Sequence, residues 1–271
     1  MDLGLDGRVY VLTGATRGLG FATARCLVAD GARVVVSSRD PANVKAAVDA
    51  LNAEAGNAGA GNAEAGNAGA GSVRASGVEA DLADAAAPQR IIETAMSSFG
   101  RLDGALLSVG GPPGGTAAQA TDEQWRQAFE TVFLGAVRAA RAVLARLDEG
   151  GAVGMVLSMS ARMPIAGLGL SNGLRPGLAG VVKDMADEYG PRGVRVFGLL
   201  PGRILTDRLR ELFAATPDAA AAQGQAEEAI PMRRIGDPAE FGRAAAFLLS
   251  PAASYLTGLS LPVDGGATRA I

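Results

Sequence analysis

Short apolar runs recur along this chain, and segments with helical periodicity lie between them. The runs are rich in Val and Leu and occur at residues 8–14, 32–38, 102–110, 151–160, 193–202 and 259–266, with a further strand expected near 73–80. Strands that are apolar along their whole length and alternate with helices are typical of a parallel sheet covered on both faces. The pattern therefore predicts the α/β class.

Two helices are marked by the residues that begin them. Thr121 and Gln124 have the spacing of a capping box, and residues 121–147 carry apolar side chains at a period of about 3.6 residues. Asp237 followed by Pro238 combines an N-cap with a proline at the first helical position. We expect helices to begin at both places.

One segment interrupts this pattern. The sequence NAEAGNAGAG occurs at residues 52–61 and again, unchanged, at 62–71. Its composition offers no large apolar side chain to offset the entropy of ordering, so we expect a flexible insertion over 52–71 between a helix and the next strand. Two copies of this length cannot build the stacked core of a solenoid.

Composition and charge narrow the possible functions. The chain has 271 residues, 48% of them hydrophobic, with scattered arginines and a net charge of −3. We therefore expect a large buried core and no nucleic-acid or membrane partner. No apolar stretch approaches the roughly 18 residues of a membrane span, and the first residues lack the pattern of a signal peptide. The expected location is the cytoplasm, and the expected partner is a small-molecule substrate.

Two residue types restrict the chemistry. Cys26 is the only cysteine, so no intramolecular disulfide can form, and its apolar neighbours indicate a core thiol. Histidine is absent altogether, which removes the most common general base and metal ligand and every Ser-His-Asp triad. No metal site is expected.

The first predicted strand runs directly into a glycine-rich turn. Gly14, Gly18 and Gly20 stand where the strand passes into a helix. Glycines at such a turn let the backbone approach a pyrophosphate, and the helix N-terminus supplies free N–H groups to bind it. The turn therefore predicts a dinucleotide site, with tight backbone packing as the alternative reason for the glycines.

The end of the second predicted strand indicates which dinucleotide binds. An NAD-binding fold carries an acidic residue there, whereas this chain has Ser38 and Arg39. Ser38 does not repel a 2′-phosphate, Arg39 can pair with it, and Arg17 supplies a second cation from the glycine turn. The sequence favours NADP(H). Asp81, after the third strand, is expected to hydrogen-bond the adenine edge.

The segments TGATRGLG, ADLAD, GVRVFGLLPGRILTD and ASYLTGLSLPVDGG resemble a short-chain dehydrogenase/reductase of the classical type across essentially the whole chain. The resemblance implies one Rossmann-like domain over 1–271, with a seven-stranded doubly wound sheet, a substrate lid over 203–235, and assembly as a homodimer or homotetramer. The motif and the resemblance together give the predicted NADP(H) contacts: Gly14, Thr16, Arg17, Gly18, Leu19, Gly20, Ser38, Arg39, Asp81, Leu82, Ser108, Gly110, Pro201, Gly202, Ile204 and Thr206.

The catalytic end departs from the family pattern. Carbonyl-reducing members use an Asn, a Ser and a Tyr-x-x-x-Lys, but none of the three tyrosines here has a lysine four residues later. Aligning residues 171–196 with the family's corresponding helix and strand puts Ser171 at the tyrosine position and Arg175 at the lysine position. The helical Asn position falls on Val132. The chain resembles an atypical subgroup, similar to β-ketoacyl-(acyl carrier protein) reductases, that carries Ser-Asn-x-x-Arg and a GGPP turn.

Three positions compete for the catalytic serine. Strict register selects Ala161, the common family spacing selects Ser158, and Ser160 is preferred as the hydroxyl nearest to the expected place. Ser160, Ser171 and Arg175 are thus the catalytic candidates.

These three candidates are not acids at neutral pH, because an aliphatic hydroxyl does not titrate and arginine stays charged. They can stabilise a developing oxyanion, while water, a substrate hydroxyl or a carboxylate such as Asp207 supplies the proton. Asp207 also fits a helix cap. Arg175 also fits a purely structural contact. Pro176 removes one helical N–H, so we expect an irregular first turn or a later helix start.

Three functions are compatible with this sequence. The first is an NADPH-dependent oxidoreductase that reduces a ketone or an activated double bond, which the intact nucleotide end favours. The second is a non-redox cyclase, dehydratase or isomerase that polarises a carbonyl, which the missing tyrosine favours. The third is a nucleotide-binding protein without turnover, against which the retained lid and nicotinamide-side residues argue.

Overall fold

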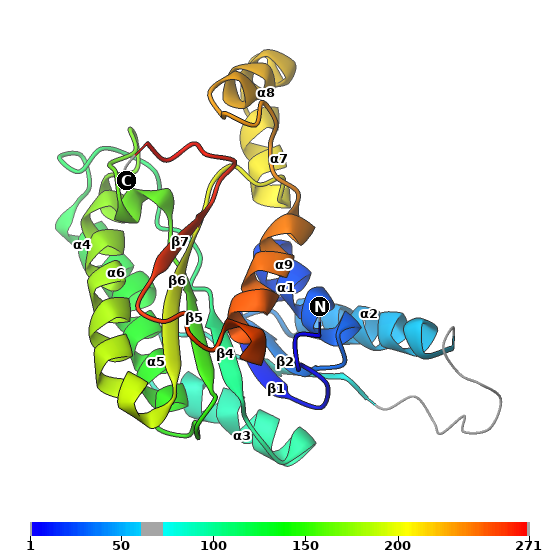
Figure 1. The fold of residues 1–271 in the computed structure, drawn as a ribbon. Helices are drawn as coiled ribbons and strands as arrows, with labels where there is room; N and C mark the ends of the chain where they lie inside the picture. Colours follow the sequence, from blue (N-terminus) through cyan, green and yellow to red (C-terminus); the bar gives the residue numbers. More distant parts are fainter. Residues whose placement is uncertain (1, 61–72, 270–271) are drawn as a thin grey trace.

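A computed structural model of the chain describes residues 2–60 and 73–269, and its centre is one parallel sheet (Figure 1). Seven strands pair in the order β3-β2-β1-β4-β5-β6-β7. They are β1 (Val9–Thr13), β2 (Arg33–Ser38), β3 (Ala75–Glu79), β4 (Gly104–Leu107), β5 (Ala152–Val156), β6 (Arg195–Pro201) and β7 (Ser260–Val263). The predicted seven-stranded, doubly wound parallel sheet is confirmed.

Helices cover both faces of the sheet because the strands bury side chains on both faces. In β1, Val9 and Val11 join one apolar core, whereas Tyr10 and Leu12 join the other. Such alternation follows from the two-residue repeat of a strand. The first core lies under α3 (Ala87–Phe99), α5 (Gly135–Leu144) and α6 (Gly169–Tyr189), and the second under α1 (Gly18–Ala29), α2 (Pro41–Ala60) and α9 (Pro238–Leu249).

The helix expected over residues 121–147 is present in three parts. Thr121 and Gln124 form the predicted capping box at the start of α4 (Asp122–Ala128). A π-helix over Phe129–Leu134 then connects α4 to α5. Its wider turn changes which side chains face inward, so Phe129 is 45% exposed and stacks on Phe133 instead of joining the core.

The expected flexible insertion over 52–71 is wrong for its first half, because α2 continues to Ala60. Alanine is the strongest helix former, and the helix has contacts that hold it. The Asn52 side-chain amide donates to the Ala75 carbonyl at 3.0 Å, and its oxygen accepts from the Arg74 N–H at 2.9 Å. Residues 61–71 of the insertion lie outside the described residues.

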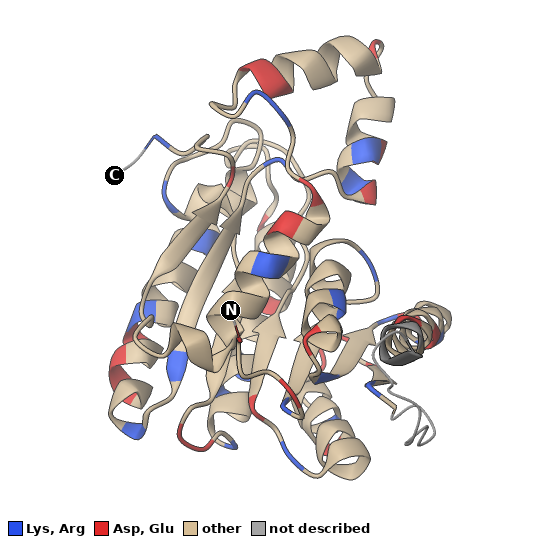
Figure 2. Ribbon diagram, turned by 45° about the vertical axis from the view of Figure 1, so that its right-hand side comes forward, with Lys and Arg blue, Asp and Glu red and all other residues tan. Residues whose placement is uncertain are grey.

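The predicted lid segment contains α7 (Asp207–Ala214) and α8 (Ala219–Glu228), which project beyond the sheet edge at which β6 ends (Figure 1). Basic and acidic residues are interspersed along the helices, and no single-sign face stands out in the view of Figure 2. Within the described residues, no helix combines the length and apolar character needed to cross a membrane.

Candidate active site

The glycine turn lies where the strand order reverses, between β1 and β4. The Thr13 hydroxyl donates to the Ser108 carbonyl at 2.9 Å and accepts from the Ser108 N–H at 2.8 Å, which joins the ends of these two strands. Gly14 has φ +57°, and a Cβ there would lie 3.0 Å from the Ser108 oxygen. In open α/β sheets, ligands bind beside such a reversal, at the carboxyl ends of the strands.

The other two glycines also meet strict spatial requirements. Gly18 has φ +59°, and a Cβ on it would approach the Thr206 methyl group to 3.5 Å. A Cβ on Gly20 would lie 2.8 Å from the Ala15 Cα, which is too close for any other residue type. Close packing therefore accounts for Gly20, while Gly14 and Gly18 leave open backbone at the start of α1.

Arg17 and Arg39 are exposed at this turn and make no ion pair or side-chain hydrogen bond within residues 2–60 and 73–269. The acidic residue beside Arg39 is engaged elsewhere. Asp40 accepts from the Ala42 N–H at 2.8 Å at the start of α2, and its backbone carbonyl accepts from the Ser38 hydroxyl at 3.2 Å. Two cations thus remain available near the end of β2.

The remaining predicted cofactor residues gather at the same sheet edge, because the carboxyl ends of parallel strands meet there. Asp81 is exposed just after β3, and its carboxylate accepts from the Ala83 N–H at 3.0 Å. Leu82 and Ile204 are buried, and Thr16 and Leu19 are half-buried. The positions at this edge also include Ser108, Gly110, Pro201, Gly202 and Thr206.

The structure brings together two of the three hydroxyls considered from the sequence. Ser160 and Ser171 lie with their Oγ atoms 2.8 Å apart, and both are buried. Ser158 instead caps the 3-10 turn Met159–Ala161, where its Oγ accepts from the Ser160 N–H at 3.1 Å. The turn aims Ser160, not Ser158, at α6.

Arg175 is buried against backbone carbonyls. One terminal nitrogen donates to the Val156 carbonyl at 2.8 Å, at the end of β5, and the other donates to the Gly110 carbonyl after β4. Its Nε is buried without a partner. Burial, and to a smaller extent the positive charge of Arg208, lowers the pKa of the Arg175 guanidinium from 12.5 to about 10. The group is therefore still charged at neutral pH.

The expected irregular start of α6 is wrong. The helix begins at Gly169 and continues through Pro176, and the Asn172 N–H donates to the Leu168 carbonyl at 2.8 Å. Pro176 is exposed, and the helix continues although the Asn172 carbonyl loses its helical N–H partner. Close packing holds the helix: Cβ atoms at Gly173 and Gly177 would clash with Trp125 and Phe133.

Asn172 has a positioning role that its sequence neighbourhood did not reveal. Its side-chain oxygen accepts from the Ile165 N–H and its amide donates to the Ile165 carbonyl, both at 2.9 Å. This pair of bonds fixes the loop that leads into α6. The position of the family's helical Asn holds Val132, which is buried in the π-helix.

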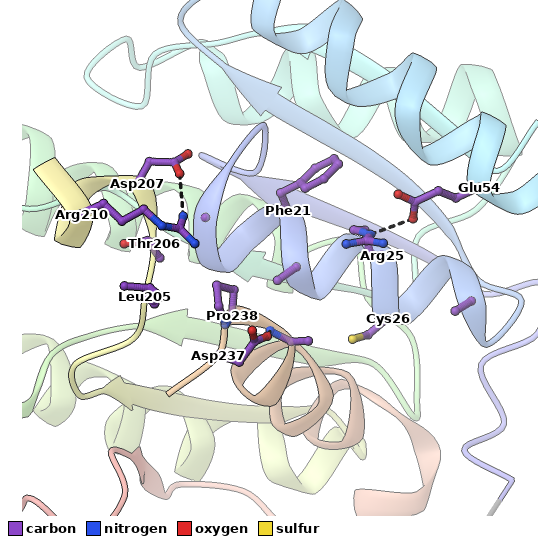
Figure 3. Close-up of a pocket in the computed structure, with 14 residues that line it drawn as sticks. Phe21, Arg25, Cys26, Glu54, Leu205, Thr206, Asp207, Arg210, Asp237 and Pro238 are labelled. Atoms are coloured by element: carbon purple, nitrogen blue, oxygen red, sulfur yellow. Dashed lines mark hydrogen bonds and ion pairs between the residues drawn. The ribbon is translucent and has the colours of Figure 1, made fainter. Parts of the chain in front are cut away.

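A cavity of about 520 Å³ lies between α1, the base of α7 and the start of α9, and Gly18 and Thr206 of the predicted cofactor site are among its lining residues (Figure 3). Two ion pairs border it, Arg25 with Glu54 at 2.7 Å and Arg210 with Asp207 at 3.0 Å. Cys26, expected in the core, packs against the core and also lines this cavity, where burial raises the pKa of its thiol.

Comparison with known proteins identifies the family. Residues 14–268 match the family described as enoyl-(acyl carrier protein) reductase. An uncharacterized oxidoreductase of Mycobacterium tuberculosis is 34% identical over 267 residues, covering 97% of this chain and 93% of that protein. Human dehydrogenase/reductase SDR family member 4 is 31% identical over 265 residues, covering 97% and 88%.

Two solved structures share the whole architecture. The NADPH-bound short chain oxidoreductase of Pseudomonas aeruginosa, described as containing an atypical catalytic center, is 30% identical with a TM-score of 0.86, covering 97% of this chain and 98% of that one. L-Sorbose reductase of Gluconobacter frateurii, complexed with NADPH and L-sorbose, is 29% identical with a TM-score of 0.86 and full coverage of both chains. The chain belongs to the short-chain dehydrogenase/reductase family of oxidoreductases.

Proposed function

We propose that this protein is an NADPH-dependent oxidoreductase that reduces a ketone or an activated double bond of a small organic substrate, at a site without the Tyr-Lys pair. The availability of Arg17 and Arg39 carries the proposal. Both are exposed beside the glycine turn, and neither has a carboxylate partner among the described residues. Free guanidinium groups at the end of β2 suit a 2′-phosphate, which NADPH carries and NADH lacks.

The residues at the sheet edge fit this cofactor. Gly14 and Gly18 place no side chain over the backbone at their own positions, and the start of α1 offers N–H groups to a pyrophosphate. Asp81 would meet the adenine edge, and Pro201 and Thr206 would border the nicotinamide. When bound, NADPH would supply the hydride that adds to the substrate carbon, and the cofactor would be oxidised to NADP⁺.

The hydroxyl pair would serve the other half of the reduction. As the carbonyl π electrons move onto oxygen, Ser160 and Ser171, 2.8 Å apart, can donate a hydrogen bond to the new oxyanion. Water supplies the proton that completes the alcohol. Arg175 acts as a positioning residue, since it ties the Gly110 loop to the end of β5 and adds a fixed positive charge.

The similar proteins support both parts of the proposal. The Pseudomonas aeruginosa oxidoreductase is NADPH-bound and is described as having an atypical catalytic center. The sorbose reductase binds NADPH with a ketose. An atypical site and NADPH are therefore compatible on this fold.

A non-redox reaction is the second candidate, because the serine pair has neither a tyrosine nor a histidine beside it as an acid.

A deuterium-transfer experiment distinguishes the reduction from the non-redox reaction. The protein would be incubated with NADPH deuterated at the nicotinamide C4, on either face, and a panel of ketones, oxo acids, their methyl esters, enones and quinones. We expect deuterium on the reduced carbon of a product. Product formed without deuterium from either face would favour the non-redox reaction and contradict the proposal.

The proposal includes a homo-oligomer, as the resemblance implies. A groove between α5 and α6 combines apolar side chains, such as Val137, Val181 and Tyr189, with charged ones of both signs, and a second copy of the chain could cover it. The charged residues are Arg138, Arg141, Asp184 and Glu188. Light scattering of the purified protein is expected to give two or four times the mass of the chain. A monomer at all concentrations would contradict this part.

A further inference from the structure

We infer that Arg208, on the first turn of α7, binds a carboxylate of the substrate, so that the reduced compound is an oxo acid. This inference rests on the proposed function and names its substrate class. The Arg208 guanidinium lies against the loop that follows β4: a Cβ on Gly111 would be 2.8 Å from one of its terminal nitrogens and 3.2 Å from the other. Gly111 directly follows Gly110, whose carbonyl accepts from Arg175.

Two cations therefore meet at this loop without an acidic partner. The only charged group that shifts the pKa of Arg175 is Arg208, and it does so by repulsion. Within residues 2–60 and 73–269, Arg208 makes no ion pair and no side-chain hydrogen bond. Like charges held together without a counterion destabilise the free protein and favour an anionic ligand.

The nearest carboxylate in the sequence is engaged on the other side of α7. Asp207 pairs with Arg210 at 3.0 Å, and both side chains line the cavity beside α1 (Figure 3). Arg208 and Arg210 thus lie on one exposed helix, yet one faces the Gly110 loop and the other faces an acid. The difference in partner distinguishes a ligand-binding arginine from a structural one.

The loop also connects Arg208 to the serine pair. Gly115 exchanges backbone hydrogen bonds with Gly167 and Gly169, at 2.7 and 2.8 Å, so the loop lies across the start of α6. Ser171 follows in the first turn of that helix. A carboxylate bound by Arg208 would enter beside this loop, which places the rest of a short oxo acid toward Ser160 and Ser171.

The test compares matched oxo acids and their methyl esters in the protein carrying NADPH. Wild type, R208Q and the control R210Q would be assayed for kcat/KM, and for binding by the fluorescence of Trp125, the only tryptophan, which packs against Gly173 on α6. We expect wild type to prefer acids, and R208Q to lose about tenfold of that preference, the size of one exposed charge-assisted hydrogen bond. R210Q removes the same charge from the same helix and is therefore the matched control. It is expected to keep the preference, because Arg210 pairs with Asp207.

Two results would overturn the inference. Equal use of acid and ester by wild type, or an acid preference that R208Q retains, would mean that Arg208 does not bind the carboxylate. A weaker affinity of R208Q for NADPH with an unchanged acid preference would assign the guanidinium to the cofactor phosphates. Failure of the proposed reduction can be told apart from failure of this inference. If only the reduction is wrong, deuterium transfer is absent while the fluorescence of Trp125 still reports acid-selective binding.

Discussion

Two buried arginines differ in how their N–H groups are used. Arg195 on β6 and Arg175 on α6 are 5% and 4% exposed. Arg195 donates to four backbone carbonyls, those of Leu248, Leu249, Ser250 and Leu256, at 2.6 to 3.5 Å. Three of them lie at the C-terminal end of α9, where the helix leaves carbonyls without partners and carries partial negative charge. Burial still lowers the pKa of Arg195, but the four carbonyls place partial negative charge around its guanidinium.

Arg175 has a poorer set of contacts for the same burial. It makes two hydrogen bonds to carbonyls, leaves Nε unpaired, and faces a second guanidinium instead of a helix C-terminus. A buried donor without a partner costs stability, and such exceptions are expected where a function maintains them. The comparison teaches that burial alone does not identify a structural arginine. The contacts that a charge still lacks are more informative.

The largest expected effect is on stability, from Arg195→Met. The substitution leaves the carbonyls at the end of α9 without their donor, so we expect a loss of about 3 kcal/mol in unfolding free energy and a fall in melting temperature of roughly 6–12 °C. Calorimetry checks this. The kcat/KM of the folded fraction is expected to stay at the wild-type value. An R195M protein that is stable but inactive would contradict the structural role assigned to Arg195.

Arg175→Met is expected to give the opposite pattern. We expect kcat/KM to fall about 100-fold, because the Gly110 loop loses its anchor and the site loses a positive charge, while unfolding free energy changes by only about 1 kcal/mol. Arg175→Lys keeps the charge but cannot span both carbonyls, so it should recover about tenfold of the loss. A melting temperature that falls as far as in R195M, with normal turnover, would assign Arg175 a structural role alone.

The serine pair sharpens the comparison on the chemical side. Ser160→Ala and Ser171→Ala each remove one partner of the 2.8 Å contact, and each is expected to lower kcat about 100-fold with KM little changed. Ser158→Ala is the matched control, since it removes only the cap of a short turn and should cost less than about 1 kcal/mol of stability. Turnover that depends on Ser158 and not on Ser160 would contradict the geometry.

The ion pair between Arg234 and Glu240 gives the smallest expected effect. The Arg234 side chain and the Asp237 N–H lower the pKa of Glu240 from 4.5 to about 2. A carboxyl group whose pKa is depressed by folding stabilises the protein above its unfolded pKa, and this stabilisation is lost as the pH falls from about 4.5 toward 2. Glu240→Gln should lower the melting temperature slightly at neutral pH, and the difference from wild type should vanish in acid. A constant difference across this range would contradict the assigned ion pair.

The sheet and the glycine turn after β1 were predictable because their signals are local. Apolar runs specify strands that are buried on both faces, and Gly14 and Gly18 stand at a turn where the backbone has positive φ. The capping boxes at Thr121 and Asp237 each involve only residues within four consecutive positions of the sequence. Each of these features depends on a short segment and its own sterics.

The candidate site was less predictable because it depends on contacts between distant segments. The choice between Ser158 and Ser160 is made by a 3-10 turn that the strand pattern did not indicate. Pro176 interrupts one hydrogen bond, but packing of Gly173 and Gly177 against two aromatic rings outweighs that local loss. The carbonyl partners of Arg175 and the position of Arg208 depend on how the loop after β4 and α7 fold over the sheet.

The most direct test of the proposed function is the affinity for NADPH and NADH, measured by cofactor fluorescence for wild type, Arg39→Gln, Arg17→Gln and the control Arg25→Gln. Arg25 is an exposed arginine of α1 that pairs with Glu54 at 2.7 Å. We predict that wild type binds NADPH about 100-fold more tightly than NADH, that R39Q and R17Q each lose about tenfold for NADPH alone, and that R25Q behaves as wild type. Equal affinities for the two cofactors, unchanged by R39Q and R17Q, would contradict the account.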